Sequence, residues 1–290
     1  NFGWYKVIAT HQSCHIEFGS FEFDFDTPST LFTEPLPSGV FRRLWADPPT
    51  LDPHLTSDTT SAGIVVEIFS GLVALNTDLQ LVPEIAESWT IDDGVVYTFI
   101  LRSNARFHNG KPVTANDFKW SLERAANPKT ASPVADTYLN DIVGVQDVFD
   151  GKTSDISGIK VIDDYTIQFT IDSPKAYFLA KLTYPTAYVL DRENVEAGGR
   201  NWTDNPVGTG PFMLKEYRVG ERIVLERYEN YHREPANVDT ILMNLAGGQS
   251  MAMYENDEID ITGVGLFDLD RVLDPTSSLN PQLVVAPPSF

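Results

Sequence analysis

The alternation of hydrophobic and polar residues between positions 83 and 128 predicts a strand followed by a capped helix. Residues 95–101 form a β-branched and aromatic run of strand length. Thr114 and Asp117 have the spacing of a capping box, which predicts a helix that begins near Ala115. One face of this helix is apolar at helical spacing and consists of Phe118, Leu122 and Ala125.

Similar patterns predict further elements on both sides of this unit. A polar run at residues 56–61 precedes a helix with Ile64, Ile68 and Leu72 on one face and Gly71 near its end. A second helix is expected after Ser173, with Pro174 in its first turn. Strands are predicted at residues 40–45, 159–162, 165–171, 212–217, 222–228 and 240–245, with a Val219-Gly220 turn between the fourth and the fifth.

Three motifs in this order carry a family resemblance. They are DPPTLDPHLTSDTTSAGIVVEIFSGL at residues 47–72, PEIAESW with FHNGKPVTANDFKWSLERA at 83–125, and NPVGTGPFMLKEYRVGERIVLERYENYH at 205–232. With these motifs the chain resembles the family 5 solute-binding proteins of ABC importers, from about residue 40 to about residue 263. The family's usual ending of one helix, a small residue followed by Gly-Glu-Ile-Asp, appears here as Asn256-Asp257-Glu258-Ile259-Asp260.

The resemblance implies a mixed α/β (α+β) fold like that of the type II periplasmic binding proteins. We expect a first lobe and an inserted α+β subdomain, with the second lobe missing, because family members are commonly about twice as long as the matched part. The expected boundaries are an atypical N-terminal extension at 1–39, a discontinuous lobe I at 40–75 and 183–264, the inserted subdomain at 76–182, and the start of the missing lobe at 265–290.

Two segments are candidates for ligand contact. Asp58, Thr59, Thr60 and Ser61 stand at the start of a predicted helix, where free backbone amides suit a ligand carboxylate or carbonyl. The alternative is a simple N-cap. Gly208 and Thr209 lie in a glycine-rich loop that suits either a tight turn or close approach to a ligand. In the resembled family the first segment borders the ligand cleft and the second lies near the lobe junction.

The resemblance also implies a function without chemistry. A protein of this family captures peptides reversibly by lobe closure and delivers them to the transmembrane subunits of an ABC permease, without a cofactor and without catalysis. Sugar or a metal chelate is the alternative cargo. The implied location is periplasmic or extracytoplasmic, and many bacterial members of the family carry a lipoprotein tether in their full-length form. The residues around Cys14 lack the pattern of a lipidation site.

Composition narrows the classes of partner. The 290 residues include 41 Asp and Glu against 21 Lys and Arg, and the resulting formal charge of −20 opposes nucleic-acid phosphates, so no nucleic-acid partner is expected. A single cysteine excludes an intrachain disulfide. No window reaches the roughly 18 consecutive apolar residues of a membrane span.

A secreted hydrolase is the rival class. Residues 248–252, Gly-Gln-Ser-Met-Ala, resemble a nucleophile elbow around Ser250. In that fold the histidine base follows the serine along the chain, whereas His232 is the last histidine here and precedes Ser250. A glycosidase needs a pair of carboxylates, and no pair is distinguished by its sequence context. We therefore expect no catalytic residues.

Residues 1–39 fit the family poorly. His11, Cys14 and His15 would share a helix face, but without an evident fourth ligand they do not predict a zinc site. Phe21, Phe23 and Phe25 alternate with acidic residues and could form one strand. Nothing in the histidine spacing favours nickel, so no metal is expected.

Overall fold

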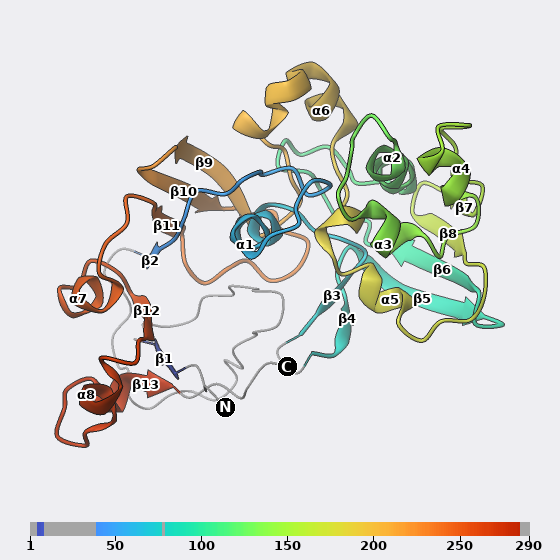
Figure 1. Cartoon of the computed structure of the whole chain (residues 1–290). Coiled ribbons are helices and arrows are strands. Elements are labelled where there is room, and N and C mark those ends of the chain that lie inside the picture. The colour runs from blue at the N-terminus through green and yellow to red at the C-terminus, as the bar shows by residue number, and fades with distance from the viewer. Residues whose placement is uncertain (1–4, 9–38, 77–78, 285–290) are drawn as a thin grey trace.

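The computed structural model describes residues 5–8, 39–76 and 79–284, and these residues form two main sheets with helices around them (Figure 1). The larger sheet has seven strands in the order β13-β1-β12-β2-β11-β10-β9. Its strands are β1 (Tyr5–Ile8), β2 (Val40–Leu44), β9 (Phe212–Arg218), β10 (Arg222–Arg227), β11 (Thr240–Asn244), β12 (Ile261–Val264) and β13 (Leu283–Val284).

The middle of this sheet is parallel. Both β11 and β12 pair with β2 in parallel, whereas β10 pairs antiparallel with β9 and with β11. The carboxyl ends of β2, β11 and β12 therefore lie at one edge of the sheet. Each of these strands is followed by a loop and a helix, namely α1 (Thr59–Ile68), α7 (Ser250–Glu255) and α8 (Leu269–Leu273).

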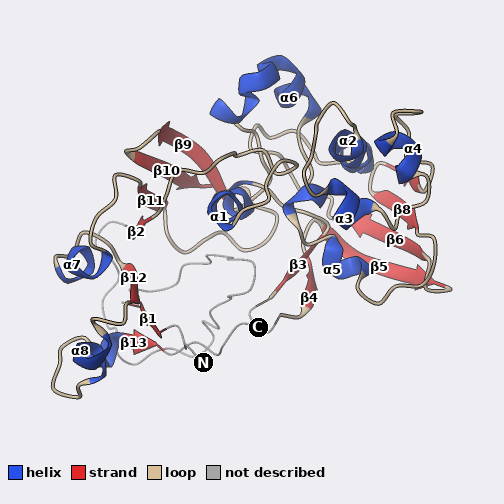
Figure 2. Cartoon of the chain, in the orientation of Figure 1, coloured by secondary structure: helices blue, strands red, loops and turns tan. Residues whose placement is uncertain are grey.

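The second sheet is antiparallel, has the order β5-β6-β8-β7, and carries helices on one side (Figure 2). Its strands are β5 (Ala86–Asp92), β6 (Val96–Leu101), β7 (Ile159–Asp163) and β8 (Thr166–Thr170). The helices around it are α2 (Ala115–Ala126), α3 (Ala135–Leu139), α4 (Val145–Phe149) and α5 (Phe178–Lys181). A small hairpin of β3 (Val73–Leu75) and β4 (Leu81–Pro83) leads into it. The remaining helices are η1 (Pro185–Ala187), α6 (Arg192–Gly198), η2 (Gly199–Asp204) and η3 (Asn280–Gln282).

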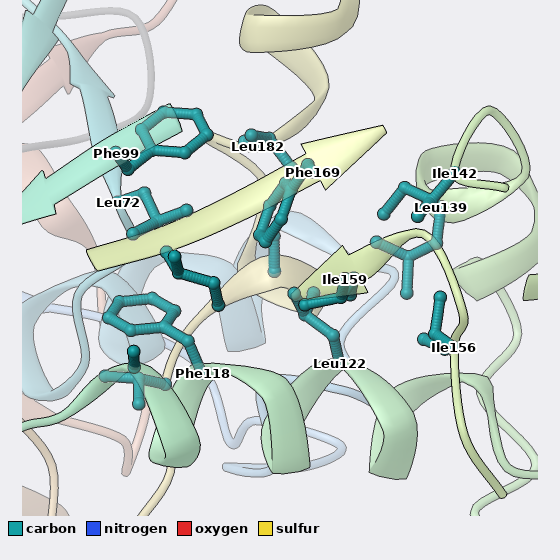
Figure 3. Packing of buried hydrophobic residues seen from close by; sticks show 14 of the residues in the cluster. Leu72, Phe99, Phe118, Leu122, Leu139, Ile142, Ile156, Ile159, Phe169 and Leu182 are labelled. Atoms are coloured by element: carbon teal, nitrogen blue, oxygen red, sulfur yellow. The ribbon is translucent and has the colours of Figure 1, made fainter. Parts of the chain in front are cut away.

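Each sheet has a hydrophobic core of its own. Figure 3 shows Phe99 and Phe169 of the smaller sheet facing Phe118 and Leu122 of α2. A second core joins α1 to the larger sheet and includes Ile64, Ile68, Phe212, Ile223 and Leu225. A third, smaller cluster lies around α7 and α8 and includes Met251, Tyr254 and Val272.

Most predicted elements are present where local sequence signals place them. The capping box of Thr114 and Asp117 starts α2 at Ala115, as predicted. The hairpins of β7 with β8 and of β9 with β10 are confirmed, and Gly220 in the second turn has a φ of 72°. The predicted strand of residues 21–26 and the residues His11, Cys14 and His15 lie outside the described residues.

Two helix boundaries differ from the prediction. The helix expected to start at Ser173 begins only at Phe178, because the Ser173 hydroxyl donates to the Asp172 carboxylate (3.1 Å) rather than capping a helix. The helix expected to end near Gly71 ends at Ile68, since residues from a distant loop bond to its last carbonyl. No helix among the described residues is long and apolar enough to cross a membrane.

Candidate functional site

The start of α1 is held against the carboxyl end of β2. The Trp45 indole N–H donates to the Thr60 carbonyl (3.1 Å), and the Thr50 amide donates to the Ser61 hydroxyl (3.2 Å). The loop between β2 and α1 thus lies at the edge where the parallel strands end. Open α/β sheets bind ligands outside the carboxyl ends of their strands, so this edge is the candidate site.

The four predicted residues 58–61 form the first turn of α1 and its cap. Asp58 is extended, with φ −127° and ψ 157°, and its Oδ1 accepts from the Ser61 amide (2.8 Å). Ser61 is completely buried, whereas Ser57 and Thr59 are exposed. Asp58 is therefore the N-cap of α1.

A row of backbone donors precedes and enters this helix. Within the described ranges, the backbone N–H groups of residues 57–60 donate to no protein acceptor. Unpaired main-chain donors need water or a ligand, and the first N–H groups of a helix also carry its positive dipole end. We call residues 57–60 the donor edge.

Gly208 and Thr209 lie at the opposite end of the same helix. The amides of Thr209 (3.0 Å) and Gly210 (2.8 Å) donate to the Ile68 carbonyl, and the Thr209 hydroxyl accepts from the Ser70 amide (3.0 Å). A Cβ on Gly208 would lie 1.9 Å from the Ile68 oxygen. Because α1 has 10 residues and is about 15 Å long, the structure separates these two residues from the donor edge.

His108 connects this loop to the smaller sheet's side of the molecule. Its Nδ1 accepts from the Gly208 amide (3.2 Å), and its Nε2 lies 3.0 Å from the Gly210 carbonyl. These partners require a neutral ring with the proton on Nε2. Burial lowers the pKa of His108 to about 4, which is consistent with that neutral form.

A buried polar cluster fixes the loop that leads to the donor edge. Arg124 of α2 donates to both oxygens of Asp52 (3.1 and 2.6 Å) and to His54 Nδ1 (2.8 Å), and the Trp202 indole also donates to Asp52 (3.3 Å). Although burial opposes ionisation, the Arg124 hydrogen bonds hold the pKa of Asp52 below its usual value. Burial, with the Arg124 charge adding to it, lowers the pKa of His54 to about 4.

A second buried cluster is centred on Glu84, between β4 and β5. Its carboxylate accepts from the Tyr231 hydroxyl (2.5 Å) and Arg233 (2.6 Å), and His232 Nε2 lies 3.0 Å from it. Burial opposes ionisation of Glu84, but the His232 contact and the other partners lower its pKa to about 2. Sequence reasoning identified neither cluster, although Asp52, His54, Arg124 and His232 all stand in the quoted motifs.

In the part of the chain that the structure describes, the candidate site is made of backbone donors and not of a cluster of metal ligands. No group of three or more His, Cys, Asp or Glu residues is placed to hold a metal ion there. Ser250, the serine of the elbow-like motif, is the first residue of α7. What the edge offers is hydrogen-bond donors in a fixed row, which suits reversible binding.

Comparison with known proteins identifies the family. The sequence model of the bacterial extracellular solute-binding proteins, family 5, matches residues 80–282. The periplasmic oligopeptide-binding protein OppA of Escherichia coli is 37% identical over 222 residues, which are 73% of this chain and 40% of that protein. The probable deoxycholate-binding periplasmic protein YgiS of Escherichia coli is 34% identical over 240 residues, with 79% and 44% covered.

Solved structures show the same fold. The Escherichia coli murein tripeptide binding protein MppA aligns with a TM-score of 0.75 at 29% identity, over 82% of this chain and 48% of that chain. Haemophilus influenzae OppA in complex with RPPGFSPFR aligns with a TM-score of 0.74, also at 29% identity and with the same coverage. The fold is thus the mixed α/β fold of these periplasmic binding proteins, and this chain spans about half of their length. The chain belongs to the bacterial extracellular solute-binding proteins of family 5.

Proposed function

We propose that this protein is the solute-binding receptor of an ABC importer and that it captures peptides without changing them chemically. The observation that carries the proposal is the donor edge, where four successive backbone N–H groups have no protein acceptor among the described residues and run through the extended Asp58 into the first turn of α1. An extended peptide presents carbonyl acceptors along its backbone, and the free N–H groups before and within the first turn of a helix can donate to such carbonyls. Family membership and the peptide-binding relatives support the same cargo.

The charge at the donor edge favours a carbonyl over a carboxylate as the ligand group. The Asp58 carboxylate already occupies the anion position at the start of α1, where it caps Ser61. A ligand carboxylate at the same amides would meet this negative charge at short range. We therefore assign peptide carbonyls to the amides of Thr59 and Thr60.

We propose that the other candidate residues support the site from a distance. Ser61 is buried and bonded to Thr50, so it fixes the loop rather than the ligand. Gly208 and Thr209 hold the last carbonyl of α1 and thereby fix the helix whose first turn carries the donors. Gly208 and Thr209 would thus contribute to binding by positioning α1 and not by contacting the peptide.

The proposed division of the chain assigns one sheet to each part. Residues 40–75 and 183–264 would form lobe I around the larger sheet, 76–182 the inserted subdomain around the smaller one, and 265–290 the start of the second lobe. Near the boundaries the two parts share packing, because Leu72, Val73, Ala187 and Val189 lie in the core of the smaller sheet, and β13 pairs in the larger sheet. Ligand would be enclosed by closure of the second lobe over the donor edge, and the closed form would dock on the permease subunits. No covalent step is involved, so the protein is a receptor and not an enzyme.

We propose a periplasmic or extracytoplasmic location, because the named relatives are periplasmic. In that compartment a receptor would meet imported peptides before the permease does. A lipid tether in the full-length form stays a prediction.

Native mass spectrometry tests the cargo. The protein would be expressed in its host from the complete reading frame, purified without refolding, and its bound small molecules released by denaturation. We expect a set of intact peptides, and added peptide should be recovered uncleaved after incubation. Recovery of a sugar, a metal chelate or a bile acid in place of peptides would contradict the proposal, as would cleavage of the peptide.

A further inference from the structure

Two tyrosines form a stacked pair beside the donor edge. Tyr138 of α3 and Tyr184, which precedes η1, have ring centroids 3.9 Å apart and ring planes inclined by only 10°. The Tyr184 hydroxyl donates to the Thr56 carbonyl (3.4 Å), one residue before the donor edge. The stack therefore stands directly next to the segment that is proposed to bind the peptide backbone.

This stack is not part of a hydrophobic core. Both rings are only partly buried, and neither belongs to the three core clusters of the described residues. The aromatic pairs inside the core around α2 are tilted or edge-on, such as Tyr97 with Phe178 (55°) and Phe169 with Phe178 (76°). In a parallel pair each ring covers only one face of the other, and an aromatic face attracts cations and planar groups.

The charges around the stack favour a cation. Burial raises the pKa of the Tyr184 phenol, and the nearby Tyr138 and Asp58 raise it further, so the phenol is neutral. The Asp58 carboxylate is therefore the negative charge close to the stack. Lys181, three residues before Tyr184, is already bonded to Asp141 (2.6 Å) and Asn140 (2.9 Å). No lysine or arginine within the described ranges forms an ion pair with Asp58. Asp58 thus supplies negative charge that no described lysine or arginine balances by direct contact.

We propose that the Tyr138 and Tyr184 stack is a side-chain subsite for an arginine or lysine of a bound peptide, with Asp58 providing the opposing charge. The planar guanidinium of arginine suits an aromatic face better than the compact ammonium of lysine. The inference rests on the proposed peptide-binding function. The subsite adds a preference for particular peptide side chains. The donor edge cannot supply this preference, because hydrogen bonds to the peptide main chain do not depend on the side chains.

Calorimetry with matched peptides tests the subsite in the protein expressed from its complete reading frame. Alanine tetrapeptides would carry arginine, or its neutral analogue citrulline, at each position in turn. At one position we expect arginine to bind about tenfold more tightly than citrulline. Tyr138→Leu keeps an apolar side chain but removes the aromatic face, so it should lower this ratio severalfold, mainly by weakening the binding of the arginine peptide.

Controls separate loss of the subsite from loss of the fold or of binding altogether. Tyr177→Leu removes an exposed tyrosine of the same region that lies outside the stack, and it should keep the tenfold ratio. Tyr138→Phe keeps the face and should also keep the ratio. Peptides that bind wild type without any arginine preference, or a Tyr138→Leu variant that retains the preference, would overturn the subsite and leave peptide binding intact. A wild-type protein that binds none of the peptides would overturn both proposals.

Discussion

Arg124 Nη2 lies 2.6 Å from Asp52 Oδ2, in a buried ion pair that joins α2 to the loop before α1. Removing one partner leaves the other charge buried, so Arg124→Met should lower the free energy of unfolding by about 3–5 kcal/mol. Urea denaturation would measure this change. The double variant Asp52→Asn with Arg124→Met removes both charges and should recover part of the loss. Equal stability of wild type and Arg124→Met would contradict the structural role of the pair.

The buried histidines predict a pH dependence of stability. Both His54 and His108 have a pKa of about 4 in the folded protein, below the usual value near 6.5 for an unfolded chain. Between these values the unfolded chain binds more protons, so stability should be full above about pH 6.5 and fall as the pH drops towards 4. Each residue should account for a loss on the order of 3 kcal/mol.

Denaturation curves at pH 7, 6 and 5 check this slope. The window avoids the low pH at which Glu84, with a pKa of about 2, begins to lose its own contribution between about pH 4.5 and 2. His108→Gln removes one titrating group and should flatten the slope. An unchanged slope in this variant would show that His108 is not the group responsible.

Glycine at position 208 is required by space, because a Cβ there would lie 1.9 Å from the Ile68 carbonyl oxygen. Gly208→Ala should therefore displace the loop from α1 and destabilise the protein by about 1–3 kcal/mol. Gly263→Ala is a matched control, since its Cβ would meet no atom within 4 Å. Thermal unfolding would measure the melting temperatures of both variants. Equal melting temperatures of Gly208→Ala and Gly263→Ala would contradict the close contact.

Asp257 occupies a left-handed backbone conformation, with φ 58°, where the resembled family usually has glycine. An L-residue with a Cβ is strained there, so Asp257→Gly should raise stability by about 0.5–1 kcal/mol. The Arg42 guanidinium bonds to the carbonyl of this residue, and the substitution keeps that acceptor. Asp257→Asn tests the charge alone and should have a smaller effect. A destabilised glycine variant would speak against strain at this turn.

Sequence reasoning succeeded where the signal is local. The capping box of α2 and the turn at Gly220 depend on residues a few positions apart, so their patterns predict them directly. Hydroxyl and carboxylate groups at residues 58–61 indicated a helix start, but the same residues serve an N-cap and a ligand site equally well. The polar pattern alone therefore could not separate the two roles.

The features that the sequence did not predict depend on contacts between residues that are far apart in the chain. Nothing near Thr209 in the sequence reveals that its hydroxyl accepts a hydrogen bond from the Ser70 amide, 139 residues away. The pair of Asp52 and Arg124 joins two motifs 72 residues apart. Such pairs follow from tertiary packing, which hydrophobic periodicity does not specify.

The most direct test of the donor edge removes a single N–H group. Thr59 is the first residue of α1 and follows the extended Asp58, a position at which proline is tolerated. Thr59→Pro deletes the backbone donor with little effect on the helix, whereas Thr59→Ala keeps the donor and removes only the hydroxyl. Peptide affinity would be measured by calorimetry on the protein from its complete reading frame. We predict that Thr59→Pro weakens peptide binding about tenfold at an unchanged melting temperature and that Thr59→Ala does not. Equal peptide affinity of Thr59→Pro and wild type would contradict the account.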